Sequence, residues 1–181
     1  KEREHILIHM IFHPKSIGVL LETRPEILRW DDSYTVEEET NALYYKILRH
    51  CINYSALVSF KLLFEAIPKR DQSIRNTLLY DAVWCPAIFL YIIKQHRNPK
   101  TLKESFTKAT DGKPFSLLQT SLAQEQPESF FILMDTYDSD LERTAALMTL
   151  PLDKLLDTTG SCTRRLEYIM RLYRKPERVI G

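Results

Sequence analysis

The sequence predicts an all-α protein built from stacked antiparallel helical hairpins. Paired apolar segments separated by a turn signal recur along its 181 residues, whereas the alternating polar–apolar runs typical of strands are scarce. An apolar doublet ends each pair, and successive doublets are about 30 to 42 residues apart, the range found in helical repeats. The doublets are Leu20–Leu21, Leu62–Leu63, Ile92–Ile93, Leu133–Met134 and Ile169–Met170.

Each predicted unit reads as a helix, a tight turn, a longer helix and a variable loop. The first helices are expected in 5–12, 42–52, 76–83, 115–122 and 151–159. The turns follow at His13–Pro14, Asn53, Cys85–Pro86, Gln126–Pro127 and Gly160–Ser161, and proline suits the first position of a helix. We therefore expect one domain of five units, with about ten to thirteen helices in all. The unit boundaries are 5–35, 36–70, 76–113, 114–150 and 151–178.

The uncharged run 82–93 is too short for a membrane helix, which needs about 20 apolar residues, and it contains Pro86. We interpret it as part of a central core helix, and the sequence predicts no transmembrane segment. The loops 97–113 and 135–150 are long enough for extra helices, and Ser139 with Glu142 predicts a capped start for one. The acidic residues in 135–142 lack the register of a calcium loop, so we expect them to cap that helix.

The last helix, from Thr163 to about Lys175, is expected to close the array. Its predicted inward stripe is Leu166, Ile169, Met170 and Tyr173, and its arginines would form a basic outer face. That face fits either a solvated end or a surface that binds an anionic partner.

The pattern resembles ankyrin repeats in degenerate form. In 76–95, Thr77, Leu79 and Ala82 match the family's opening motif, and Ile92–Ile93 match its closing Leu–Leu pair. The resemblance implies a repeat solenoid that binds proteins, in the style of effectors that bacteria or viruses direct at host cells. Four glycines in the whole chain are fewer than ankyrin turns use, so another helical-hairpin repeat or an irregular helical bundle also fits.

Composition excludes some classes of protein. With 44% hydrophobic and 27% charged residues the chain is not disordered, and a net charge of +1 gives no reason to expect nucleic acid. Three widely spaced cysteines predict an intracellular, reducing compartment, which includes a host cytoplasm if the protein is secreted into one. Because the first residue is Lys1, we expect a fragment or a processed form.

Candidate chemical sites are few. His5, His9 and His13 recur every four residues, but no further metal ligand lies nearby in the sequence, so we expect surface residues and no metal. Cys162 precedes two arginines at a helix start, which favours a reactive thiol, but no histidine follows it as a base. Cys51 and Cys85 are expected to be ordinary buried thiols.

Two functions remain in view. The first is a non-catalytic module that docks a partner protein and needs no cofactor. Its predicted binding residues are Trp30, Arg164, Arg165, Arg171 and Arg174. An anionic lipid-binding domain that uses the basic C-terminal helix is an alternative to it that the sequence does not favour. The second function is an enzyme whose site combines His9, His13 and Cys162 from distant positions.

Overall fold

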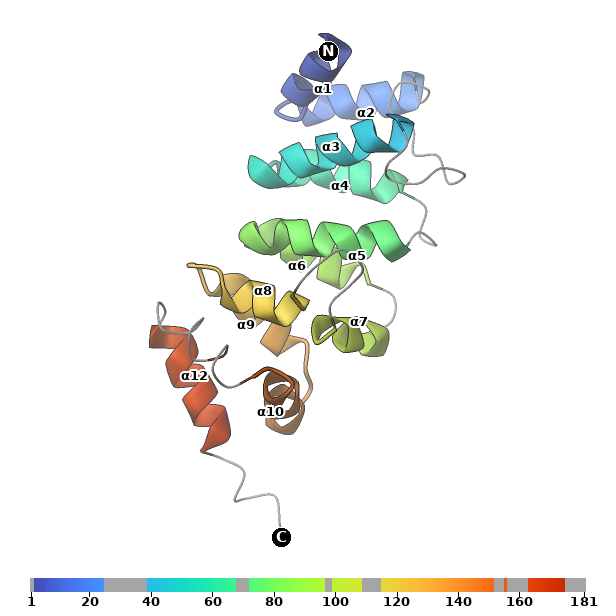
Figure 1. The fold of residues 1–181 in the computed structure, drawn as a ribbon. Coiled ribbons are helices and arrows are strands. Elements are labelled where there is room, and N and C mark those ends of the chain that lie inside the picture. Colours follow the sequence, from blue (N-terminus) through green and yellow to red (C-terminus); the bar gives the residue numbers. More distant parts are fainter. Residues whose placement is uncertain are drawn as a thin grey trace. The chain divides into compact units, whose positions relative to one another are not determined.

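The computed structural model describes residues 2–24, 39–67, 72–96, 99–108, 115–151, 155 and 163–174. Figure 1 shows the helices of these residues along the chain. Their bounds are α1 (Glu2–Met10), α2 (Pro14–Thr23), α3 (Glu39–Asn53), α4 (Leu57–Ala66), α5 (Gln72–Asp81), η1 (Ala82–Trp84), α6 (Pro86–Lys94), α7 (Pro99–Phe106), α8 (Leu117–Leu122), α9 (Glu128–Asp135), α10 (Asp140–Met148) and α12 (Thr163–Tyr173).

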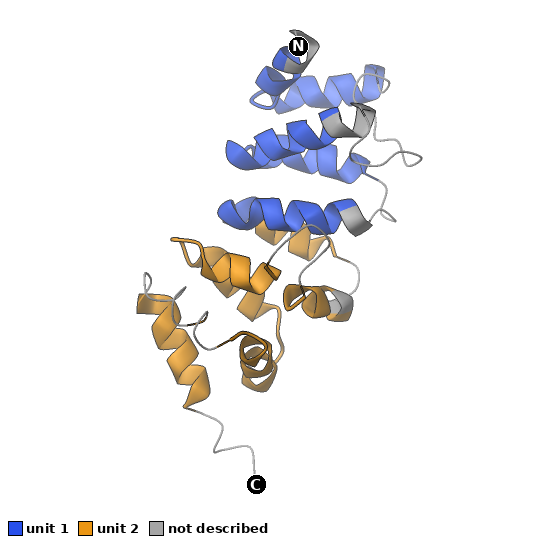
Figure 2. Ribbon diagram, viewed as in Figure 1, with its two compact units in different colours: residues 1–88 blue, residues 89–181 orange. Residues whose placement is uncertain are grey.

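Two compact units divide the chain, Lys1–Ile88 as unit 1 and Phe89–Gly181 as unit 2 (Figure 2). Helix α6 begins in unit 1 and ends in unit 2. These units are clusters of packed residues, so the division of the chain into five repeats stays a prediction.

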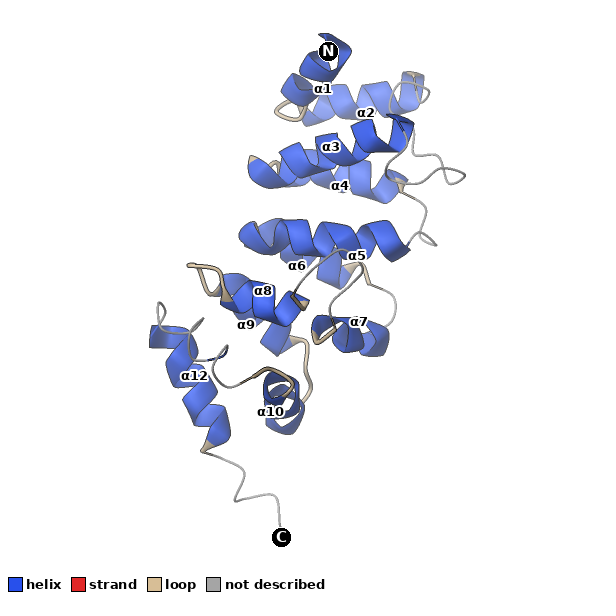
Figure 3. Cartoon of the chain, viewed as in Figure 1, coloured by secondary structure: helices blue, strands red, loops and turns tan. Residues whose placement is uncertain are grey.

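The predicted all-α class is confirmed. Every regular element among the described residues is a helix, eleven of them α-helices and one a 3-10 helix (Figure 3). Their number lies within the range expected from the paired apolar segments.

Unit 1 contains two hairpins that contact each other helix by helix. The first hairpin is α1 with α2, and the second is α3 with α4. Between the hairpins, α1 contacts α3 and α2 contacts α4, and α3 also contacts α5 and η1. First helices therefore pack on first helices and second on second, which is the local arrangement of a stacked hairpin repeat.

Proline marks the start of the second helices, as the sequence predicts. Pro14 and Pro86 are the first residues of α2 and α6, and Pro127 directly precedes α9. The missing proline N–H costs nothing there, because the first N–H groups of a helix have no intrahelical partner.

The turn between α3 and α4 depends on a serine in a backbone conformation that favours glycine. Ser55 has φ 53°, the only positive φ at a non-glycine residue in the described chain. Its N–H donates to Ile52 O (3.1 Å), and the N–H of Ala56 donates to Cys51 O (2.8 Å). These two bonds are those of a Schellman motif, which normally places glycine at this position.

The run 82–93 crosses the division between unit 1 and unit 2, and most of its side chains are buried. Within this run, side chains such as Val83, Ile88 and Ile92 are buried, which confirms the core interpretation. Trp84 and Ala87 are exposed, and 71% of the surface of Trp84 is accessible. The 3-10 helix η1 changes the angular spacing of side chains just before α6, so this tryptophan leaves the core face.

Polar side chains join the hairpins of unit 1 by donating to carbonyl groups near helix ends. Ser59 of α4 donates to Ile11 O, after α1, and Tyr44 of α3 donates to Leu63 O in the last turn of α4. Arg75 of α5 donates to Ile67 O at 2.9 Å, with its guanidinium 4.4 Å from the centre of the Phe64 ring. All three donors are buried.

Unit 2 contains the two extra helices expected in the loops. Helix α7 lies within 97–113, and α10 begins after Ser139, whose side chain accepts from the N–H of Glu142 at 3.2 Å. The Glu142 carboxylate accepts from the N–H of Asp138, so acidic residues do cap this helix. Lys103 of α7 also pairs with Asp138 (2.6 Å) and Glu142 (3.2 Å), joining the two extra helices.

We predict that Ser55→Gly stabilises the protein by about 0.5–1 kcal/mol, because glycine adopts this backbone conformation without steric cost. Chemical denaturation of the variant measures the change. Ser55→Ala is the control, since it also loses the 3.6 Å contact between Cys85 Sγ and Ser55 Oγ but keeps a Cβ. If the glycine variant is less stable than the alanine variant, the left-handed backbone at Ser55 is not what limits the stability of this turn.

We predict that Ile92→Asp unfolds the domain, because a carboxylate at this buried position costs several kcal/mol. Arg171→Ala, on the exposed side of α12, should leave the free energy of unfolding within about half a kcal/mol. Circular dichroism during thermal unfolding compares the two. Equal tolerance of both substitutions would contradict the assignment of residue 92 to the core.

Candidate functional site

The buried side chains of α12 differ from those that the sequence predicts. Arg165, Ile169 and Leu172 are buried in α12, whereas Met170 is 45% exposed and Tyr173 is also exposed. The predicted inward stripe is therefore wrong, apart from Ile169 and the partly buried Leu166.

Arg165 is a structural residue, so its assignment to a partner-binding outer face is wrong. Its side chain is fully buried, and its Nη1 donates to Ser121 O in the last turn of α8 at 3.2 Å. Its Nε and Nη2 have no hydrogen-bond partner among the described residues. A carbonyl near the end of a helix needs a donor, and the long arginine side chain reaches it from α12.

A surface hollow of about 500 Å³ lies between α9 and α12 and contains two of the predicted binding residues. We call it the arginine–aromatic hollow. Its lining residues are Phe131, Asp135, Arg164, Glu167, Tyr168 and Arg171.

Ring contacts hold the floor of this hollow together. Phe131 and Tyr168 meet edge to face, with ring centres 5.4 Å apart and planes at 88°. The guanidinium of Arg164 lies 4.9 Å from the centre of the Phe131 ring, and that of Arg171 lies 5.3 Å from the Tyr168 ring. Stacking on a ring orients a guanidinium while its N–H edge stays able to donate to a partner.

The hollow carries charges of both signs. Asp135 and Glu167 stand beside the two arginines, so the surface matches a partner with mixed charge better than a simple anion. Burial raises the pKa of Tyr168 and outweighs the lowering effect of Arg143, so this phenol is neutral at physiological pH. Stacked aromatic and arginine side chains are the groups most often found at the energetic centre of protein interfaces.

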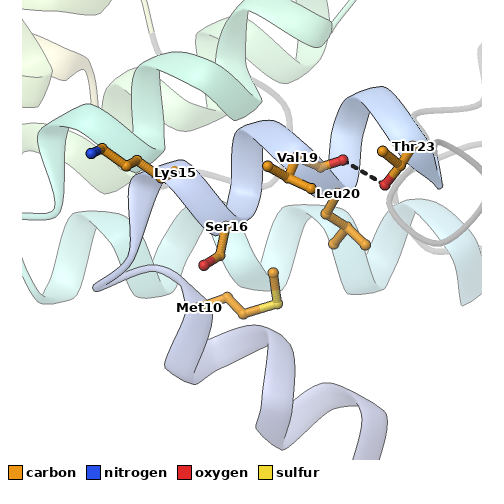
Figure 4. Close-up of a pocket in the computed structure, with 6 residues that line it drawn as sticks. All are labelled: Met10, Lys15, Ser16, Val19, Leu20 and Thr23. Atoms are coloured by element: carbon orange, nitrogen blue, oxygen red, sulfur yellow. Dashed lines mark hydrogen bonds between the residues drawn. The ribbon is translucent and has the colours of Figure 1, made fainter.

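A second hollow, of about 400 Å³, lies on the first hairpin. Met10 of α1 and Ser16, Val19 and Leu20 of α2 form most of its wall, with Lys15 and Thr23 at the edge (Figure 4). Thr23 donates to Val19 O at 2.7 Å, so its hydroxyl serves the helix itself. This hollow is mainly apolar and offers few groups that would orient a ligand.

The three candidate histidines do not form one stripe. His5 and His9 are close on α1, with their Nε2 atoms 3.3 Å apart, but His13 lies beyond this helix as the N-cap residue that precedes α2. In the described part of the chain, no three His, Cys, Asp or Glu side chains are arranged to hold a metal ion.

Of the remaining candidates, Arg174 is exposed just after α12, whereas Trp30 and Cys162 lie outside the described residues. Cys51 and Cys85 are free and buried, as expected. Burial raises the pKa of the Cys51 thiol to about 12, so it is protonated and unreactive at neutral pH.

The sequence reasoning missed the aromatic half of the hollow. Neither Phe131 nor Tyr168 was predicted from the sequence as a surface residue. Helical periodicity identifies the face of each helix but not which helix lies opposite, so the pairing of α9 with α12 left no signal in the sequence.

Comparison with known proteins identifies no relative. No family model, no curated protein and no solved structure matches the chain. Among the helices of the described residues, none has both the length and the apolar character that crossing a bilayer requires.

We predict that Arg165→Met lowers the free energy of unfolding by about 1 kcal/mol, because Ser121 O loses its donor while methionine fills the space without a buried charge. Arg165→Ala should lower it by roughly 2 kcal/mol more through the cavity it leaves. Urea denaturation of both variants checks this. A loss of several kcal/mol in Arg165→Met would instead reveal an ionic partner of the guanidinium.

Proposed function

We propose that the chain is a non-catalytic module that docks a partner protein. The observation that supports this most is the arginine–aromatic hollow, where Arg164 and Arg171 lie on the Phe131–Tyr168 pair at an accessible surface. In this proposal the two guanidinium groups donate to acidic or carbonyl groups of the partner, and the rings bury its apolar side chains.

The hairpin contacts of unit 1 support the repeat part of the proposal. First helices contact first helices and second contact second, as in ankyrin-like arrays that bind proteins. We keep the ankyrin-like solenoid, the intracellular compartment and the effector role within this proposal. No cofactor or nucleic acid belongs to it, and Trp30 and Arg174 remain proposed contacts.

An enzyme that uses His9, His13 and Cys162 is the competing function. His9 is exposed and close to His5, while His13 is the N-cap residue before the next helix. These positions do not favour a shared active site for the two histidines, so the docking module is the better supported proposal.

A pull-down with the full chain from a cell lysate tests the proposal. We expect Arg164→Ala and Arg171→Ala each to weaken capture of a specific partner by about thirtyfold, the effect of losing a side chain at an energetic centre. Lys94→Ala is the matched control, since Lys94 is an exposed cation at the end of α6.

Trp30→Ala and Arg174→Ala extend the same assay to the other proposed contacts. If all four variants retain the partner while Cys162→Ala abolishes a measurable turnover, the docking proposal is wrong and the enzyme takes its place.

A further inference from the structure

Three exposed aromatic side chains occupy successive helix-to-helix connections of unit 1. Phe12 lies between α1 and α2, Tyr54 between α3 and α4, and Trp84 ends η1 just before α6. Their exposed fractions are 52%, 57% and 71%. Figure 1 shows the turns after α1 and α3 and the end of α5 at the same edge of unit 1. We call these three residues the aromatic row.

Contacts between neighbouring turns hold the row in place. The rings of Phe12 and Tyr54 meet at 5.4 Å with an interplanar angle of 69°, and His50 stacks on Tyr54 at 6.2 Å. The next turn is joined by the contact between Ser55 Oγ and Cys85 Sγ, and Cys85 directly follows Trp84. The row is therefore a feature of the stacked hairpins rather than three independent loops.

The apolar character of this edge continues into the helices that follow each turn. Val58 and Ala87, the second residues of α4 and α6, are both exposed. None of the three aromatic residues lines either of the two hollows described above. Large apolar side chains that project from an edge suit a broad, deformable surface better than a small ligand.

The charges beside the row are mainly positive. Lys15 is exposed one residue into α2, and Arg49 is exposed in the last turns of α3. The nearby carboxylate, Asp81, lies 3.5 Å from Arg49 Nε and also accepts a hydrogen bond from Tyr45. Asp81 is largely covered, and its ion pair with Arg49 offsets part of both charges, whereas Lys15 is exposed and the Arg49 side chain remains 57% exposed.

We propose that the aromatic row binds the interface of a lipid bilayer that contains anionic phospholipid. Trp84, Tyr54 and Phe12 enter the headgroup layer, where tryptophan and tyrosine are most favourable, because their rings are apolar and their N–H and O–H groups reach water. Lys15 and Arg49 face the phosphate groups. This activity is separate from the docking proposed for the arginine–aromatic hollow, since it uses other residues in the other unit.

Fluorescence of a single tryptophan tests the proposal. These 181 residues contain two tryptophans, so Trp30→Phe leaves Trp84 as the reporter. Vesicles of phosphatidylcholine with about one third phosphatidylserine should shift its emission to shorter wavelength, and pure phosphatidylcholine should shift it less. Phe12→Ser/Tyr54→Ser should reduce partitioning at least about tenfold, measured by vesicle sedimentation.

Two further variants test whether charge and the position of the row determine binding to vesicles. Lys15→Gln should weaken binding about fivefold on the anionic vesicles and leave binding to phosphatidylcholine unchanged. Leu141→Ala is the control, because Leu141 is 67% exposed on α10 of unit 2, outside the row. Circular dichroism of each variant verifies that its helices are retained.

The proposal is overturned if neither vesicle shifts the emission of Trp84, or if Leu141→Ala weakens binding as much as the row variant. It is equally overturned if Trp84→Ser abolishes capture of a protein partner while the row shows no affinity for vesicles. That result would assign the row to a protein interface.

Discussion

Carbonyl groups near helix ends are the constraint on which both units depend. The last carbonyls of an α-helix have no intrahelical donor, and many of them here are buried among neighbouring helices. Side chains from other helices supply the missing N–H and O–H groups. Tyr44, Ser59 and Arg75 do so in unit 1. In unit 2, Arg165 donates to Ser121 O, and Arg143 donates to Met134 O and Tyr137 O.

The scarcity of glycine explains why side chains carry this role. Helices commonly end on a glycine in the left-handed conformation, which lets backbone N–H groups satisfy the final carbonyls. This chain has four glycines, and Gly18, the one in the described residues, lies inside α2. Only the turn at Ser55 uses the left-handed conformation among described non-glycine residues. Other helix ends are also capped locally. The N–H of Arg24 donates to Leu20 O after α2, and the N–H and hydroxyl of Thr149 donate to Ala146 O after α10.

The helical spacing of apolar residues correctly predicted those features that are determined within a single segment of the sequence. The all-α class, the proline starts at Pro14 and Pro86, and the capped helix after Ser139 all follow from local spacing. The predictions were wrong or incomplete where the environment of a side chain depends on a second segment that packs against it. The spacing of apolar residues does not show that Ser121 O in α8 accepts a hydrogen bond from Arg165. The predicted inward face of α12 therefore left out this buried arginine. The arginines of the hollow were predicted from their charge. The aromatic residues beneath them could be predicted only from the contact between α9 and α12, which the sequence does not show.

The side-chain donors also bear on how such a chain evolves. In arrays of near-identical repeats, neighbouring units meet through a standard interface, so duplication or deletion of one repeat leaves a compatible pair. Here Ser59 matches a carbonyl of the preceding hairpin, and Arg75 matches one of the hairpin before it. Each junction has its own donor and acceptor. Loss of one hairpin would leave buried groups unmatched on both sides, so we expect single substitutions to be tolerated more readily than the loss of a hairpin.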